Sequence, residues 1–532
     1  MIACLWLLAT LGLAVVLDLL MGFRLGWRFR AVLAIVCVAL QTVASVGLVL
    51  LSPSVATVGI LIVSAYSIFN QMRVVRSTSD EPRLFQAANI TGTCLGLAQI
   101  ALGIVTVLDW QWPFTALGLL ALWACSQLAT AIGLTLSARR QIYATAAIRP
   151  EQDEALKNLS TNTLPSITVA IPVRNEDRQL AACLDSILAS DYPKLEVLAL
   201  DDSSADRTPE IIKGYAHAGV RFVRGDAPDP KWLPKNQVYD KLMREASGSL
   251  ILFCGADIRF EPQSIRALEA LLHTKHKTML DILPENRQAK KLPWVQAMRY
   301  YWEMAPARRR FKRPPVLSSC WLISREELDK AGGFTSAKQS ISPESHIARA
   351  LIAHDGYSFV RSDSGLGVTS EKDLHDQHQT AIYTRYPQLH RRPELVLLLS
   401  LVELLLLSGP LWLTITAIIL GLLHSWVIPA ACIVAAVLSL ALNSVTFGKI
   451  QQLAFTKTKL PNILLSYIPA LLLDIWLLHV SMVKYEFSKV IWKDRDVRPP
   501  VMQQLQVIPA LPPLPPEPAI KSLKVGDIDR KG

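Results

Sequence analysis

The sequence contains little charge for its length and no arrangement of cysteine or histidine that marks a metal site or a disulfide scaffold. Only 19% of its 532 residues are charged and 51% are hydrophobic, whereas about 25% are charged in a typical soluble protein. This balance excludes a disordered or fibrous chain and favours a membrane protein. The eight cysteines form no C-x-x-C pair, and no histidine cluster accompanies them, which argues against structural zinc and against a disulfide framework.

The sequence also lacks a nucleic-acid-binding motif and any basic stretch interleaved with aromatic residues. Its net charge of +11 is modest for 532 residues. We therefore expect no nucleic-acid partner. The positive charge is expected to meet an anionic membrane surface or a ligand that carries phosphate.

Long apolar stretches lie on both sides of a more polar middle segment, and a bilayer span needs about 20 mostly apolar residues. Residues 1–138 contain five such stretches, which predict an N-terminal transmembrane bundle of about five helices. The first stretch lacks a basic start and a cleavage site, so we interpret it as a retained anchor rather than a signal peptide. Residues 394–484 contain three more, which predict transmembrane or interfacial helices. Residues 139–165 are expected to be a linker, and residues 485–532 a basic and then proline-rich, disordered tail.

Basic residues in the loops predict the orientation of these helices. Arginines follow the first, third and fifth stretches, whereas the loops at 52–54 and 109–113 carry no Lys or Arg. The positive-inside rule therefore predicts a multi-pass protein of the cell membrane with a cytoplasmic middle domain. Three full C-terminal spans would export the tail, yet a Lys/Arg cluster follows the last one directly. We therefore expect one of the three to be interfacial or re-entrant, with the stretch around the helix-breaking Gly409-Pro410 step as the candidate.

The middle segment, residues 166–393, alternates between short β-branched runs and helical patterns. Four strands are expected, at 166–173, 195–200, 220–223 and 249–254. The alternation predicts a doubly wound, parallel α/β sheet, and such sheets bind ligands beyond the carboxyl ends of their strands. Five polar residues follow these strand ends: Asn175, Glu176, Asp201, Asp202 and Asp257. Taken singly they are equally consistent with helix capping, as Asp201 is for the helix expected near Thr208.

Five short segments follow one another through this domain in a fixed order. They are IPVRNE at 171–176, DDSSADRT at 201–208, WLPKN at 232–236, LFCGADIRF at 252–260 and SREELDKAGGF at 324–334. Together they resemble the landmarks of the family 2 glycosyltransferases over about 166–375, and the flanking membrane helices add to the resemblance. The resemblance implies a GT-A, Rossmann-like nucleotide-sugar-binding domain between transmembrane helices. Membrane-bound ceramide, hopanoid and carotenoid glucosyltransferase-like proteins and cellulose-synthase-like proteins are similar.

The resemblance also implies roles for the residues that match the family's motifs. Six of them would line the donor pocket: Pro172, Asn175, Glu176, Asp201, Asp202 and Lys235. Asp201 or Asp202 would contact the nucleobase or ribose, and Lys235 would reach the diphosphate. Asp257 matches the second aspartate of the family's D-x-D motif, which binds Mg²⁺ or Mn²⁺, hard cations that take carboxylate and phosphate oxygens.

Two departures from the family's pattern concern the metal and the base. Gly255 stands in place of the first D-x-D aspartate, which removes one acidic contact to the metal. Ser345 stands where the family has its catalytic aspartate, directly after Glu344, and a serine cannot act as a general base by itself. Glu344, our predicted catalytic residue, or His346 could accept the proton instead. Equally, Pro343 and Glu344 could merely begin a helix.

A third departure concerns the Q-x-x-R-W motif of processive members. The nearest segment runs from Ile382 to Tyr386, with Ile382 in place of the glutamine and Tyr386 in place of the tryptophan. Arg385 is the expected contact to the diphosphate. The segment gives no evidence for a polymerase.

These observations predict a membrane-bound glycosyltransferase that moves a sugar, with inversion, from a nucleotide-sugar donor such as a UDP-sugar to a lipid or membrane-associated acceptor. Gly255 and Ser345 support an alternative, a degenerate relative that binds a nucleotide sugar without turnover. A third class, a transporter with a cytoplasmic insert, is disfavoured because the apolar stretches carry few charges.

Overall fold

The structure, a computed structural model, describes most of the chain between residues 2 and 496. The segments left out within these limits are 21–26, 53, 77–91, 93–94, 97, 104–105, 107–112, 146–163, 230, 287–293, 307–314, 317–319, 424–425, 456–459 and 494. The chain divides into two units, Met1–Val497 and Arg498–Gly532. The second unit, with most of the predicted proline-rich tail, lies outside the described residues, as do most of the predicted linker and much of the fourth predicted apolar stretch.

The middle domain is built on a seven-stranded sheet with the strand order β3-β2-β1-β4-β8-β6-β9. The strands are β1 (Ile167–Val173), β2 (Leu195–Asp201), β3 (Val220–Arg224), β4 (Leu250–Cys254), β6 (Met279–Leu283), β8 (Cys320–Ser324) and β9 (Tyr357–Arg361). β1, β2, β3 and β4 are parallel, as the alternation of strands and helices predicts. β8 is antiparallel to both of its neighbours, which the sequence could not indicate because a short apolar run carries no information on strand direction.

Helices cover both faces of this sheet. The helices are α7 (Leu180–Leu188), α8 (Thr208–Gly214), α9 (Pro234–Glu245), α10 (Ser264–Thr274), α12 (Arg325–Lys330) and α13 (Pro343–Ile352). Apolar side chains of α7, α8 and α10 form one buried cluster with the sheet, and those of α9 and α13 form another. In the second cluster the rings of Phe253 and Trp321 stack with their centres 4.3 Å apart. The predicted α/β fold is confirmed.

A second, three-stranded sheet positions one wall of the site. It has the order β5-β10-β7, formed by β5 (Ile258–Phe260), β10 (Val368–Ser370) and β7 (Glu285–Asn286). β5 follows β4 almost directly, and its antiparallel register with β10 sets Ser370 opposite Ile258. Ser370 is thereby held beside Asp257 at the end of β4.

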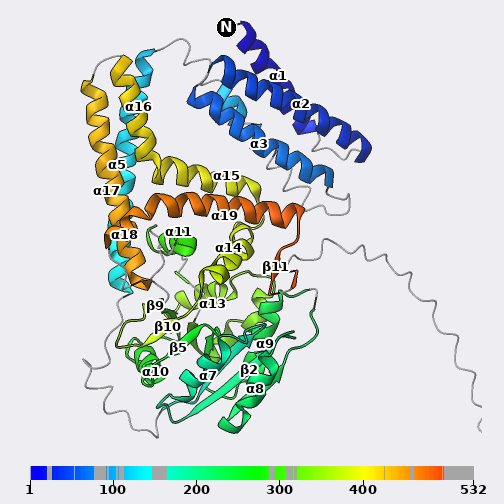
Figure 1. The fold of residues 1–532 in the computed structure, drawn as a ribbon, viewed down its shortest axis with the longest axis vertical. Helices are drawn as coiled ribbons and strands as arrows, with labels where there is room; N and C mark the ends of the chain where they lie inside the picture. The colour runs from blue at the N-terminus through cyan, green and yellow to red at the C-terminus, as the bar shows by residue number, and fades with distance from the viewer. Residues whose placement is uncertain are drawn as a thin grey trace, which may run out of the picture. The chain divides into compact units, whose positions relative to one another are not determined.

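Long apolar helices flank the domain in the sequence. They are α1 (Ile2–Leu20), α2 (Trp27–Leu51), α3 (Val55–Arg76), α5 (Pro113–Ala144), α15 (Pro393–Val402), α16 (Gly409–Leu423), α17 (Val427–Ala454), the short α18 (Leu460–Leu465) and α19 (Tyr467–Phe487). Four segments among the described residues are long and apolar enough to cross a membrane: Ala31–Leu51, Leu119–Ala144, Val427–Ala454 and Tyr467–Phe487. α1, α2 and α3 pack as one group, and α5, α16 and α17 pack as another (Figure 1).

The helix containing the predicted Gly409-Pro410 break is broken there. The two parts, Pro393–Leu405 and Gly409–Leu423, are bent by 58° relative to each other, which is the geometry of a broken span or a re-entrant segment. A π-helical turn at Glu403–Leu407 precedes the break. Proline and π-turns are established causes of such bends. The predicted break of this helix is confirmed by the observed bend.

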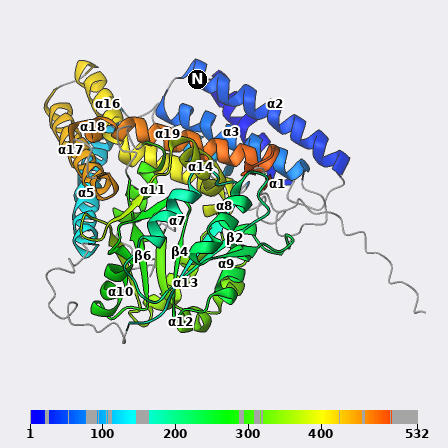
Figure 2. The same ribbon diagram turned by 60° about the horizontal axis from the view of Figure 1, so that its bottom comes forward.

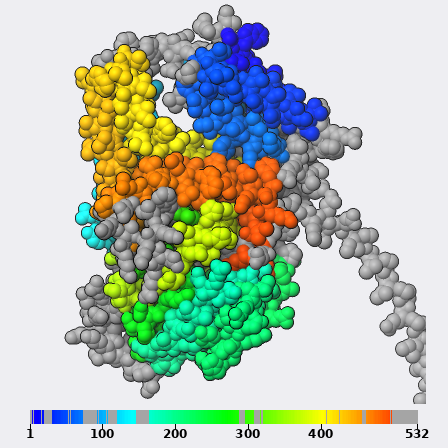
Figure 3. All heavy atoms as spheres, in the orientation of Figure 1, coloured from blue at the N-terminus to red at the C-terminus, as the bar shows by residue number. Residues whose placement is uncertain are grey.

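α19 joins the apolar helices to the middle domain. It packs on α11 (Trp294–Met304) and α14 (Leu374–Gln388) and runs across α5 and α17 rather than alongside them (Figures 1 and 2). The Ser481 hydroxyl donates to the Ile382 carbonyl at 2.6 Å, and the Tyr485 hydroxyl donates to the Tyr383 carbonyl at 2.8 Å. Figure 3 shows α19 as a band between α3 and the middle domain. The sequence identified α19 only as one more apolar stretch.

Candidate active site

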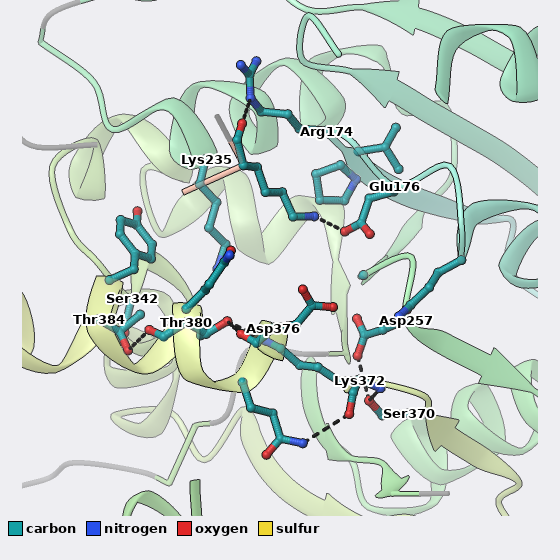
Figure 4. Close-up of a pocket in the computed structure, with 18 of the residues that line it drawn as sticks. Arg174, Glu176, Lys235, Asp257, Ser342, Ser370, Lys372, Asp376, Thr380 and Thr384 are labelled. Atoms are coloured by element: carbon teal, nitrogen blue, oxygen red, sulfur yellow. Dashed lines mark hydrogen bonds and ion pairs between the residues drawn. The ribbon is translucent and has the colours of Figure 1, made fainter. Parts of the chain in front are cut away.

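A cavity of about 230 Å³ lies beyond the carboxyl ends of β1, β2 and β4 (Figure 4). Val173 pairs with Asp201 in the sheet register, so the loops that follow β1 and β2 start at the same level. The cavity is therefore where a doubly wound sheet is expected to bind a ligand. Its opposite wall comes from α14 and the segment before it, with further residues from α9 and α11.

The loops after β1 and β2 hold each other in place. Asn175 has a φ of 49° and Ser203 a φ of 55°, left-handed conformations that are uncommon for residues other than glycine. The Asn175 backbone N–H donates to the Ser204 hydroxyl at 3.0 Å, and the Ala205 N–H donates to the Asn175 side-chain oxygen at 2.9 Å. Asp201 accepts from the Ser204 N–H at 3.2 Å. Asn175 and Asp201 thus brace the loops from which Glu176 and Asp202 reach the cavity.

Two cations from the C-terminal side of the chain lie against the cavity's acidic residues. They belong to a short hairpin, β11 (Ile491–Trp492) and β12 (Arg495–Asp496), that follows α19. The Lys493 ammonium pairs with Glu176. The two terminal nitrogens of Arg495 donate to the Asp202 carboxylate at 2.8 and 3.2 Å. Sequence reasoning missed this hairpin, whose only signal was the basic cluster after the last apolar stretch.

Burial and these cations shift the pKa values of the Glu176 and Asp202 carboxyl groups in opposite directions. Burial raises the pKa of Glu176 above its ordinary value, and Lys493 partly opposes that shift. Burial also raises the pKa of Asp202, against the opposing effect of Arg495. For both carboxyl groups the effect of burial is the larger one, so their pKa values stay above the ordinary ones with the cations in place.

Asp257, the predicted metal ligand, is on the cavity wall but stands apart from other ligand groups. Its Oδ2 accepts a hydrogen bond from the Ser370 hydroxyl at 2.7 Å. A Cβ atom added at Gly255 would lie 2.5 Å from its Oδ1, so the carboxylate fills the space that a side chain at position 255 would need. No group of three or more His, Cys, Asp or Glu is placed to hold a metal within the described part of the chain. Asp257 therefore offers a single carboxylate to the predicted Mg²⁺ or Mn²⁺, and phosphate oxygens of a donor and water would have to supply the remaining ligands.

The wall opposite the strand ends presents a lysine and an aspartate that sequence reasoning also missed. The Lys372 ammonium donates to the Thr380 hydroxyl at 2.8 Å. Burial lowers the pKa of Lys372, and the nearby Asp257 carboxylate opposes this shift. Asp376 lies in the first turn of α14, where its backbone N–H is capped by Asp373 at 2.7 Å. Its carboxylate makes no hydrogen bond or ion pair with any described residue, and it points into the cavity (Figure 4).

Four of the predicted site residues do not line the cavity: Asn175 and Asp201, which brace its loops, and Glu344 and Arg385. Glu344, in the first turn of α13, is only 1% exposed, and neither of its carboxylate oxygens has a hydrogen-bond partner among the described residues. Arg385 is buried and pairs with Asp474 of α19. Thr380 and Thr384 share the cavity face of α14 because they are four residues apart, and Arg385 is rotated away from that face.

Five of the predicted site residues do line the cavity: Pro172, Glu176, Asp202, Lys235 and Asp257. The Lys235 ammonium lies 5.2 Å from the centre of the Tyr239 ring, on the same wall. Arg299 of α11 also lines the cavity, and nothing in the sequence pattern singled it out. Lys372 and Asp376 follow β10, a strand of the second sheet that the sequence analysis did not predict, so no pattern singled them out either.

Comparison with known proteins assigns this domain. Residues 168–332 match the model of the family described as Glycosyl transferase family 2, the family that the motifs of this segment resemble. A 95-residue segment is 32% identical to 4,4'-diaponeurosporenoate glycosyltransferase of Staphylococcus aureus (strain bovine RF122 / ET3-1) and covers 18% of this chain and 24% of that protein. A 101-residue segment is 31% identical to glycosyltransferase AglE of Haloferax volcanii and covers 18% of this chain and 32% of that protein. The chain thus spans no more than a third of the length of these two relatives.

Solved structures resemble the chain more distantly. Mannosyltransferase PcManGT from Pyrobaculum calidifontis, solved in complex with GDP-Man and Mn²⁺, gives a TM-score of 0.38 at 17% identity, over 69% of this chain and 98% of that chain. The Staphylococcus aureus protein TarS, solved with UDP-GlcNAc, gives a TM-score of 0.31 at 13% identity, over 60% of this chain and 91% of that chain. Similarities this low carry no argument about the function of this chain.

Proposed function

We propose that this protein is a membrane-bound glycosyltransferase that moves a sugar from a nucleotide-sugar donor, such as a UDP-sugar, to a lipid or membrane-associated acceptor with inversion. The observation that carries the proposal is the cavity at the strand ends of a family 2 domain, lined by Glu176, Asp202 and Asp257. The two relatives described above support it, since both are named as glycosyltransferases.

The donor is proposed to bind on the strand side of the cavity. Glu176 and Asp202 offer carboxylate oxygens that can accept hydrogen bonds from ribose hydroxyls or from a nucleobase. Arg495 and Lys493 now take those oxygens, so the donor would replace them or rearrange them. Lys235 and Asp257 lie further along the wall, toward the place where the diphosphate and the sugar would lie.

The acceptor is proposed to enter from the side of α11 and α14. These two helices form the far wall of the cavity and pack directly on α19 and, for α11, on α17. A cavity that opens between a soluble domain and apolar helices suits an acceptor held in a membrane. The 4,4'-diaponeurosporenoate in the name of the Staphylococcus aureus relative is compatible with such an acceptor.

Asp376 is our proposed general base. Inversion by a single displacement needs one group that accepts the proton of the acceptor hydroxyl, and that group must come within hydrogen-bond reach. Glu344 was predicted for this role, but its side chain is almost fully buried and does not line the cavity. The Asp376 carboxylate lines the wall and has no partner among the described residues, so the structure favours it.

The test is a panel of nucleotide sugars offered to the full-length protein in detergent. Isothermal titration calorimetry should detect binding of one or a few donors, and Asp202→Ala should weaken that binding in a protein that still unfolds cooperatively on heating. Release of free nucleotide from the bound donor would support turnover. Binding without any release would favour the degenerate relative, and no binding to any donor would refute the proposal.

We also propose a cytoplasmic domain and a cytoplasmic tail. Lys493 and Arg495 contact Glu176 and Asp202, so the segment after α19 lies on the same side of the membrane as the domain. This requires an even number of crossings after the domain, which α16 and α17 supply if α19 lies along the membrane surface. In a variant without its native cysteines, a cysteine at Ser52 should react with an impermeant reagent from outside the cell, and one at Thr78, outside the described residues, should not. The reverse labelling pattern would contradict this topology.

A further inference from the structure

Two groups that were expected to offset the charge of a diphosphate are not arranged to do so. Position 255 is a glycine, and the Asp257 carboxylate is folded back over it and onto the Ser370 hydroxyl. This leaves a poor set of ligands for a divalent cation. Arg385, the expected arginine contact, is paired with Asp474 on the far side of α14. Of the expected cationic contacts, Lys235 does line the cavity, so any further positive charge there has to come from residues that the motifs did not single out.

Lys372 is placed to supply that charge. Its backbone N–H donates to the Ser370 hydroxyl at 3.3 Å, and the same hydroxyl donates to Asp257, so the three residues form one structural unit on the cavity wall. Its ammonium extends across to Thr380 of α14, at 2.8 Å. Figure 4 shows this side chain lying between Asp257 and α14.

The ammonium group of Lys372 has more N–H donors than its one hydrogen bond to Thr380 uses. A lysine carries three N–H donors, and the Thr380 hydroxyl takes one. The Asp257 and Asp376 carboxylates lie near enough to favour its charged form, and among the described residues neither forms an ion pair with it. A buried cation is costly unless it is paired, so an anion that enters the cavity would be bound strongly here. Lys235 and Arg299, on the same cavity, add to the positive potential.

We propose that Lys372 binds the diphosphate of the donor and stabilises it as the leaving group, in the place that a protein-bound divalent cation would otherwise occupy. This inference rests on the glycosyltransferase function proposed above. During transfer the bond between the sugar C1 and the diphosphate oxygen breaks, and its electron pair stays on that oxygen. The acceptor oxygen forms the new bond to C1, and its proton passes to the Asp376 carboxylate. Lys372 donates a hydrogen bond to the oxygen that gains charge and keeps its own proton.

The test compares UDP and UMP binding to the full-length protein by calorimetry, with excess EDTA or with Mg²⁺, and repeats the comparison with GDP and GMP. The parent should bind the diphosphate equally well in both conditions. Lys372→Gln should weaken diphosphate binding by about 10- to 100-fold, the range expected for a charge-assisted hydrogen bond, and should affect the monophosphate much less. Lys372→Arg should recover most of the loss.

Three controls make the result specific to this site. Lys275→Gln removes a partly buried lysine at the end of α10, away from the cavity, and should leave nucleotide binding unchanged. Thr380→Val keeps the charge but removes the hydroxyl that positions it, and should cause a smaller loss than Lys372→Gln. Thermal unfolding of each variant tests whether it is folded, and Thr380→Val keeps the inference testable if Lys372→Gln fails to fold.

Two results would overturn the inference and leave the proposed function intact. One is diphosphate binding by the parent that disappears in EDTA, together with Mn²⁺ bound in the nucleotide complex by electron paramagnetic resonance. The other is unchanged diphosphate affinity in folded Lys372→Gln. If the parent binds no nucleotide with or without metal, the proposed function itself fails.

Discussion

Replacing Asp376 by asparagine should distinguish the two carboxylates that compete for the role of general base. The amide has nearly the same shape as the carboxylate but cannot accept the proton of an acceptor hydroxyl. General-base catalysis contributes about 10²–10⁴-fold to a rate, which corresponds to about 3–5 kcal/mol in the barrier. Asp376 lines the cavity with no partner among the described residues, so Asp376→Asn should lose a factor in this range while keeping its nucleotide affinity.

Glu344→Gln is the matched variant, and the structure predicts a different outcome for it. Glu344 is 1% exposed, and its oxygens make no hydrogen bond with the described residues. The variant replaces one buried polar group without a described partner by another of nearly the same shape, so this protein should fold as well as the parent and transfer sugar within about threefold of its rate.

The assay for both variants is the initial rate of nucleotide release at saturating donor, with nucleotide affinity measured separately. A loss of several hundredfold in Glu344→Gln, with parental turnover in Asp376→Asn, would refute the assignment of Asp376. It would also mean that α13 turns its first residues toward the cavity when substrates bind.

Two further predictions concern ion pairs. Arg495→Gln removes the cation that donates to both oxygens of Asp202. UDP should then bind up to about tenfold more tightly by calorimetry, because one charge-assisted pair no longer has to be displaced. Equal or weaker affinity would show that Arg495 does not compete with the nucleotide. Asp474→Asn leaves Arg385 buried without its ion-pair partner. This substitution should lower the free energy of unfolding by about 3–5 kcal/mol. An unchanged thermal unfolding temperature in detergent would contradict a structural role for the pair between α14 and α19.

The parts of the fold that local sequence patterns determine were predicted well. The β-branched run at Ile167–Val173 forms a buried strand, and Glu176 and Asp202 reach the cavity because parallel strands place their carboxyl ends at one edge of the sheet. The Gly409-Pro410 step breaks its helix because proline cannot donate a backbone hydrogen bond.

The remaining features depend on contacts between distant parts of the chain. Lys493 meets Glu176 across 317 positions of sequence, and no local pattern encodes such a pair. Arg385 had a suitable residue type near the expected motif, but the rotation of α14 directs it to Asp474 instead of to the cavity. Glu344 was identified by alignment with a motif, and a motif does not reveal which face of α13 is buried.

The most direct test of the account is to follow a labelled sugar from its nucleotide to a lipid. The full-length protein would be reconstituted into vesicles made from membrane lipid extract and incubated with radiolabelled UDP-sugars, one at a time, and the organic phase would then be counted. The account predicts that at least one sugar enters the organic phase in proportion to the nucleotide released, and that Asp376→Asn abolishes both. Tight binding of a nucleotide sugar with no label in the organic phase and no nucleotide released, for every donor tried, would contradict it.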